Sequence, residues 1–120
     1  MKRFSALSAI AVGSSIYIAV RKSMEDLGIA VFDDQLSLVR ELAVLPGSNA
    51  YILWGVGDRL LLSVDNRLVL FEGGEGRVVL EVRPGNFFWH AVEVYGRVFV
   101  QECGESPTGI YVSGGSRALS

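Results

Sequence analysis

The chain offers few side chains that could do acid–base, nucleophilic or metal chemistry. Its 120 residues include one histidine, His90, and one cysteine, Cys103. His90 stands three residues before Glu93 in a strand-like segment, so their side chains point to opposite faces and make a poor acid–base pair. A lone histidine without a nucleophile elbow supports no Ser-His-Asp set, and a lone cysteine rules out a CxxC zinc cluster. We therefore expect no catalytic residue, no metal site and no cofactor.

Side chains suited to binding are better represented. Trp54 and Trp89 are the two tryptophans of the chain. An indole ring can stack on a sugar or another flat ligand, although packing inside the fold explains such a residue equally well. His90 adjoins Trp89 and joins the candidate set. The other candidates are charged residues in predicted loops: Arg21, Lys22, Glu25, Asp65 and Glu105.

Composition narrows the class of partner. The chain has 11 Lys and Arg residues against 13 Asp and Glu residues, a formal net charge of −2, and no basic run. Nucleic-acid binding therefore has no electrostatic support. Half of the residues are hydrophobic, which excludes a disordered chain, and one cysteine excludes an internal disulfide.

The first twenty residues allow two interpretations. Met1-Lys2-Arg3 precedes an uncharged run from residue 4 to 20, as in a secretory signal, and the run reaches the lower limit for a membrane span. Against this, Gly13-Ser14-Ser15 predicts a turn in the middle of the run, and the run aligns with two later segments. We expect strands here, no membrane partner, and a cytoplasmic location in preference to secretion; the signal alternative stays open.

Short apolar runs divided by turn residues predict an all-β fold. The runs are rich in Val, Ile, Leu, Phe and Tyr, and clusters of Gly, Pro, Asn and Asp separate them. Residues 77–83 alternate as a half-buried strand does, with Val78, Leu80 and Val82 on one face. No window carries the spacing of an amphipathic helix.

These runs repeat in three units, at about 4–46, 47–84 and 85–120. Each unit has a first strand, a glycine turn, a second strand, a loop, a third strand and a polar turn before a fourth strand. Pro46 and Pro84, each followed by glycine, stand 38 residues apart and end the first two units. The first strands align at 6–12, 50–56 and 87–94, and the second strands at 16–20, 60–64 and 98–102. The third strands align at 28–33, 67–72 and 109–114. The fourth strands align at 38–45 and 77–83, and the fourth strand of the last unit is expected to start near Arg117.

Several of these segments resemble β-propeller blades. Residues 109–115 close on a double glycine and resemble the end of a kelch-type strand, while residues 90–100 and 10–18 are similar to the first hairpin of such a blade. Kelch blades usually carry the glycine pair on the second strand, so the subfamily stays open. The resemblance and the period of about 40 residues imply a partial β-propeller of three tandem four-stranded antiparallel blades, the last incomplete.

Three blades cannot close a ring, because propellers typically use four to eight. Two copies could form a six-bladed ring, another protein chain could supply blades, or the sequence could be a fragment of a longer protein. Self-association is favoured because a twofold dimer closes the arc without new parts. We expect a protein–protein interaction or scaffold module. The alternatives are a carbohydrate-binding module resembling propeller lectins, with Trp54 and Trp89 as stacking platforms, and a piece of a propeller enzyme.

Overall fold

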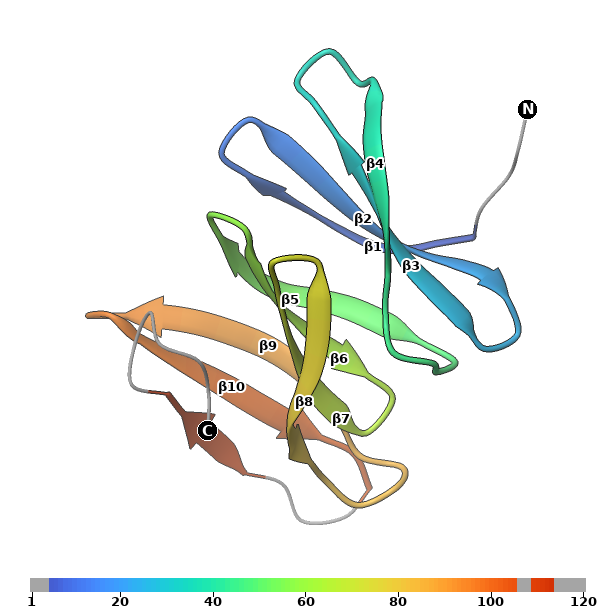
Figure 1. Ribbon diagram of the computed structural model, residues 1–120. Helices are drawn as coiled ribbons and strands as arrows, with labels where there is room; N and C mark the ends of the chain where they lie inside the picture. The colour runs from blue at the N-terminus through green and yellow to red at the C-terminus, as the bar shows by residue number, and fades with distance from the viewer. Residues whose placement is uncertain (1–4, 106–108, 114–120) are drawn as a thin grey trace.

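The computed structural model describes residues 5–105 and 109–113, and every regular element in them is a β-strand (Figure 1). The strands form three antiparallel sheets, each ordered as its strands follow in the chain. Sheet 1 contains β1 (Ser5–Val12), β2 (Ser15–Ser23), β3 (Asp26–Phe32) and β4 (Leu38–Ala43). Sheet 2 contains β5 (Ala50–Val56), β6 (Arg59–Val64), β7 (Arg67–Glu72) and β8 (Glu75–Glu81). Sheet 3 contains β9 (Phe87–Val94), β10 (Arg97–Cys103) and β11 (Ile110–Val112).

The all-β prediction is confirmed, and each sheet lies inside one of the three expected units. The expected strand at 38–45 is shorter in the structure, where β4 ends at Ala43. The last strand, expected near Arg117, lies outside the described residues.

Tight turns join the first and second strands of every sheet. Gly13, Gly57 and Gly96 occupy these turns with φ of 61°, 61° and 76°. These values lie in the left-handed region, which glycine enters without steric cost. In the third turn Tyr95 also has a positive φ, 50°, so Tyr95-Gly96 has the two positive φ angles of a type I′ turn.

The first strand of every sheet contains a β-bulge. The pairing with the second strand skips one residue: Leu7 in β1, Leu53 in β5 and Trp89 in β9. A bulge places an extra residue in one strand, and it reverses the alternation of faces beyond that point.

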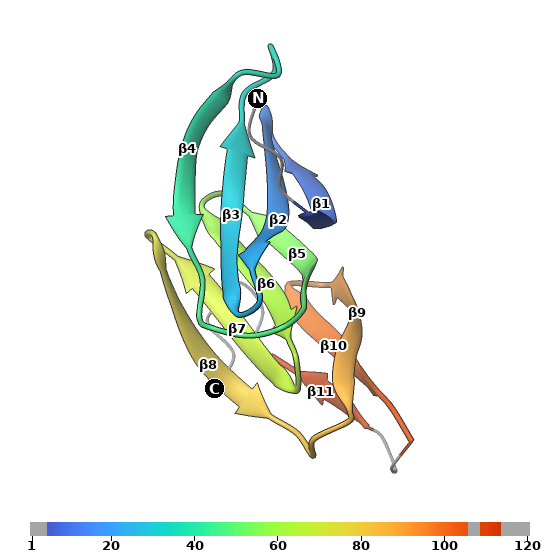
Figure 2. The ribbon, with the colours of Figure 1, turned by 90° about the vertical axis from the view of Figure 1, so that its right-hand side faces the viewer.

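The three sheets stack face to face. β1 contacts β5, and β5 contacts β9. Figure 2 shows these three first strands along one side of the molecule, with β4 and β8 along the other. Leu60, Leu62 and Val64 of sheet 2 pack in a core cluster with sheet 1. Leu61, Leu68 and Leu70 pack in a second cluster with sheet 3. The middle sheet is therefore buried on both faces.

Two serine hydroxyls connect neighbouring sheets at the bulges. Ser8 Oγ of sheet 1 accepts the N–H of Ile52 at 3.0 Å, and Ser63 Oγ of sheet 2 accepts the N–H of Phe88 at 3.1 Å. Ile52 and Phe88 each stand directly before a bulge, where the ladder of the edge strand is interrupted. The neighbouring sheet thus supplies an acceptor for each of these buried N–H groups.

The outer faces of sheets 1 and 3 are largely apolar and have no neighbouring sheet, and we call them the open faces. On sheet 3, Val92, Phe99 and Val112 lie side by side in register, and Ile110 lies on the same face. Val92 is 55% exposed and Ile110 is 69% exposed. On sheet 1, the outward residues of the two central strands are Ile16, Ile18 and Phe32, which are partly buried, and Val20 and Ala30, which are only 4% and 3% exposed. Neither core cluster of the described residues includes any side chain from these two faces.

Candidate functional site

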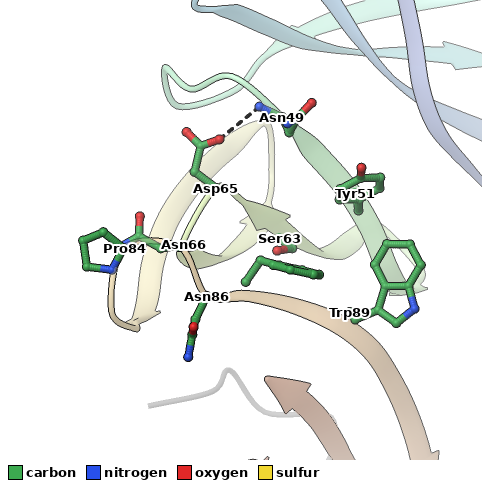
Figure 3. A pocket seen from close by; sticks show the side chains of 10 residues that line it. Asn49, Tyr51, Ser63, Asp65, Asn66, Pro84, Asn86 and Trp89 are labelled. Carbon is green, nitrogen blue, oxygen red and sulfur yellow. Dashed lines mark hydrogen bonds between the residues drawn. The ribbon is translucent and has the colours of Figure 1, made fainter. Parts of the chain in front are cut away.

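A pocket of about 500 Å³ opens between sheets 2 and 3. It lies where the β6–β7 turn meets the two connections that lead into β5 and β9. Figure 3 shows Tyr51 and Trp89 on one side of the pocket and Asn66 and Pro84 on the other. The pocket therefore has an aromatic wall and a polar wall.

Three aromatic rings form the aromatic wall. Tyr51 and Trp89 meet edge to face, with ring centroids 5.3 Å apart at 77°. Phe87 and Trp89 meet in the same way at 6.1 Å and 90°. Trp89 is nevertheless 43% exposed, because it is the bulged residue of β9 and leaves the regular alternation of that strand. Edge-to-face contacts hold this indole in place while part of its surface stays open.

The β6–β7 turn, Asp65-Asn66, builds the polar wall. The Asp65 carboxylate accepts the N–H groups of Ser48 and Asn49 at 3.1 Å, and the guanidinium of Arg67 lies 4.0 Å away. Asp65 has a φ of 53°, a left-handed conformation that aspartate tolerates in turns. These contacts hold the connection from sheet 1 to sheet 2 against the turn.

Asn66 holds the other connection. Its Nδ2 donates to the carbonyl of Val82 at 2.7 Å, and the N–H of Val82 donates to the Asn66 carbonyl at 2.9 Å. One two-residue turn thus fixes both connections that border the pocket. The polar wall is rigid because hydrogen bonds fix its backbone on both sides.

A buried carboxylate lies next to the pocket residue Asn86. Asn86 Nδ2 donates to Glu102 at 2.6 Å, and the Tyr111 hydroxyl donates to the other carboxylate oxygen at 2.7 Å. These two hydrogen bonds, that from Asn86 first, lower the pKa of Glu102 below its ordinary value. The same bond to Glu102, together with burial, raises the pKa of Tyr111. The two hydrogen bonds therefore stabilise the ionised form of Glu102, and the bond between Tyr111 and Glu102 stabilises the neutral form of Tyr111.

The structure separates the predicted binding residues. Trp89 and Asp65 line the same pocket, and the ring of His90 lies 5.6 Å from Trp89. Trp54 does not line the pocket: its Nε1–H donates to Glu93 at 3.1 Å, and it packs against the core between sheets 2 and 3. The expected pair of stacking tryptophans is therefore not brought together.

The other charged candidates lie elsewhere, and Arg21 and Lys22 belong to strand β2 instead of the expected loop. Arg21 and Lys22 line a second, shallower depression beside sheet 1. Arg21 donates to the carbonyl of Ser48 at 3.1 Å, and Lys22 pairs with Glu41 at 3.3 Å. Glu25 and Glu105 are exposed and line neither depression.

The sequence reasoning missed Tyr51, whose ring becomes part of a site only when β9 packs beside β5. Alternation alone predicts the face of Tyr51 within its own sheet and carries no signal for a partner in the next sheet.

Two kinds of feature are absent from the part of the chain that the structure describes. Residues 5–105 and 109–113 hold no group of three His, Cys, Asp or Glu side chains that could bind a metal ion. Within the same residues, no helix has the length and hydropathy needed to cross a membrane.

Comparison with protein-family models, with curated proteins and with solved structures finds no match to this chain.

Proposed function

We propose that the chain is a protein-interaction module of three β-propeller blades, and that a second copy of the same chain completes it. In this assembly sheet 3 of each copy packs on sheet 1 of the other. The support comes from the way the sheets already pack within one copy.

Within one copy, the same two kinds of sheet face meet twice. At the first interface, a face of sheet 1 that includes Tyr17, Ile29 and Val31 meets Leu60, Leu62 and Val64 of sheet 2. At the second interface, Leu61, Leu68 and Leu70 of sheet 2 meet Phe88, Val98 and Val100 of sheet 3. Sheet 2 therefore uses one face toward the sheet before it and the other toward the sheet after it.

The two open faces correspond to the two kinds of face that pack together inside one copy. This observation carries the proposal. In the alignment of the units, Phe99, Ile110 and Val112 correspond to Leu61, Leu68 and Leu70, which pack on the following sheet. Likewise, Ile16, Ile18 and Val20 correspond to Leu60, Leu62 and Val64, which pack on the preceding sheet. The open face of sheet 3 thus matches the open face of sheet 1.

A second copy offers both matching faces at once. Packing them head to tail covers the exposed apolar side chains of sheet 3 and the partly exposed Ile16, Ile18 and Phe32 of sheet 1. A twofold pair gives six sheets, within the usual range for a closed propeller. Exposed apolar patches of this kind mark interaction sites in soluble proteins. The function that follows is association through sheet faces, with the loops at one end left free for other partners.

The mass in solution tests this proposal. Size-exclusion chromatography with light scattering, over a series of concentrations, should give twice the chain mass of 13.0 kDa. Val92→Arg places a charge on the open face of sheet 3 and should give a monomer. Val78→Arg is the matched control: Val78 is also an exposed valine, on β8 outside both open faces, and this variant should stay dimeric.

Mixing two variants tests the head-to-tail arrangement. Ile18→Arg blocks the open face of sheet 1, whereas Val92→Arg blocks that of sheet 3. Each variant alone should be monomeric, and an equal mixture should form a 1:1 pair because one intact face of each kind remains. A monomeric unmodified chain, or a Val92→Arg variant that remains a dimer, would refute the proposal.

A further inference from the structure

We infer that the pocket between sheets 2 and 3 binds a neutral sugar ring, stacked on Trp89 and hydrogen-bonded to the β6–β7 turn. The pocket lies within a single copy of the chain. This inference therefore stands independently of self-association.

The size and form of the pocket suit a small ligand. Its volume of about 500 Å³ falls within the range of roughly 300–1,000 Å³ that is typical of small-molecule sites. Such sites are mainly apolar, with a few polar groups that fix the orientation of the ligand. Here Tyr51, Phe87 and Trp89 provide the apolar surface, while Asn49, Asp65 and Asn66 provide polar groups.

The exposed surface of Trp89 provides the stacking surface. A large aromatic ring that is 43% exposed leaves apolar area in water unless something covers it. Its edge-to-face contacts with Tyr51 and Phe87 hold the indole in one orientation. A ring fixed before binding loses little conformational entropy when a ligand stacks on it. The C–H face of a pyranose is an apolar surface that fits against such a ring.

The opposite wall fits the hydroxyl groups of the same ligand. Asparagine amides carry donors and acceptors together, as sugar hydroxyls do, so each amide can make paired hydrogen bonds. The Asn66 amide is oriented by its bond to the Val82 carbonyl, whereas the Asn49 side chain is exposed. Figure 3 shows Asn66 across the pocket from Trp89. A ligand between the two walls must be apolar on one side and hydroxylated on the other.

Charge in the pocket selects against ionic ligands. None of the lining residues is a lysine, an arginine or a histidine, so an anion finds no counter-charge. The one lining carboxylate, Asp65, already accepts the N–H groups of Ser48 and Asn49 and lies near Arg67. Its negative charge is therefore largely compensated, and a cation gains little there. A neutral, hydroxyl-rich ring is the class that remains.

Tryptophan fluorescence can report binding at this site alone. The chain contains two tryptophans, so Trp54→Phe leaves Trp89 as the only one. This variant is titrated with glucose, galactose, mannose and N-acetylglucosamine. We expect a saturable change in Trp89 emission with at least one of these sugars.

Calorimetric titrations with that sugar then test the residues. Trp54→Phe should bind as the unmodified chain does, because Trp54 lies outside the pocket. Trp89→Ala should weaken binding by about tenfold or more, as removal of a central aromatic anchor does. Asn49→Ala changes an exposed side chain, leaves the fold intact, and should weaken binding severalfold, so it serves as the second variant if Trp89→Ala does not fold.

Three results would overturn the inference. The first is the absence of a saturable change with all four sugars. The second is an affinity that stays the same in both Trp89→Ala and Asn49→Ala, which would place binding elsewhere. The third is saturable binding of choline with no sugar binding, which would assign the aromatic wall to a cation. Because every variant is also checked for its mass in solution, loss of dimerisation and loss of sugar binding are distinguished.

Discussion

Replacing Ser63 by alanine should lower the free energy of unfolding by about 1–3 kcal/mol, the cost of leaving a buried donor without an acceptor. Ser63 is 1% exposed, and the residue whose N–H it accepts, Phe88, is 0% exposed. Phe88 stands directly before the bulge at Trp89, where the ladder between β9 and β10 is interrupted. The Ser63 hydroxyl is the acceptor that the structure gives to this buried N–H.

The size of the effect depends mainly on the unpaired N–H of Phe88 that the substitution leaves. Ser63→Ala removes a single oxygen atom, so the lost packing is small beside the cost of the unpaired N–H. For a domain of this size the loss corresponds to a fall in Tm of roughly 4–12 °C. The separation of sheets 2 and 3 is also expected to become easier, because this hydrogen bond joins them.

Urea unfolding followed by far-UV circular dichroism measures the change. Ser23→Ala is the matched control, since Ser23 lies exposed near the end of β2 and should change the free energy by less than about 0.5 kcal/mol. The loss of free energy of unfolding in Ser8→Ala should fall between the losses in Ser63→Ala and Ser23→Ala, because Ser8 is only partly buried. If Ser63→Ala matched the control with an unchanged m-value, the hydroxyl would not be the acceptor on which Phe88 depends.

Two turns and one buried carboxylate give further measurable outcomes. Tyr95→Asn should raise the free energy of unfolding by about 1 kcal/mol, measured in urea, because the exposed Tyr95 has a φ of 50° that asparagine adopts more easily. Gly47→Ala should lower that free energy by about 1–3 kcal/mol, because an added Cβ would lie 2.8 Å from a carboxylate oxygen; an unchanged Tm would contradict the close approach. Hydrogen bonds from Asn86 and Tyr111 lower the pKa of Glu102 in the folded state, so their stabilising effect is complete above the ordinary glutamate pKa of 4.5 and is lost as the pH falls through the lowered value. Tyr111→Phe removes one of these donors and should flatten the fall of Tm with pH below 4.5, whereas an unchanged slope would show that the bond does not contribute.

The sheets could be predicted from the sequence because their signals are local. Apolar runs and the glycines at 13, 57 and 96 predict hairpins, and the structure has a positive φ at each of these glycines. Residues 60–64 of β6 and 68–71 of β7 are buried, as expected for continuous runs that are apolar apart from Ser63. These features depend on residues close together in the chain.

The site could be predicted only in part, because bulges decide which way the tryptophans point. Trp54 follows the bulge at Leu53 and lies opposite Leu61, on the face toward sheet 3. Trp89 is itself the bulged residue of its strand and reaches the pocket. The sequence predicts both residues in the first strands of their units, but the bulges send them to different surroundings. No local pattern in the chain indicates where such a shift occurs.

The bulges of β1, β5 and β9 also change what these strands offer to a strand of another molecule. These strands are sheet edges, and a regular edge offers an uninterrupted row of hydrogen-bonding groups on which a foreign strand can dock. Here each row is broken by an extra residue, and at Ile52 and Phe88 a serine of the adjacent sheet already occupies the donor. An incoming strand could match only a short stretch before losing register. Interrupted edges of this kind disfavour templated aggregation, and the proposed dimer would then associate through its sheet faces and not through its edges.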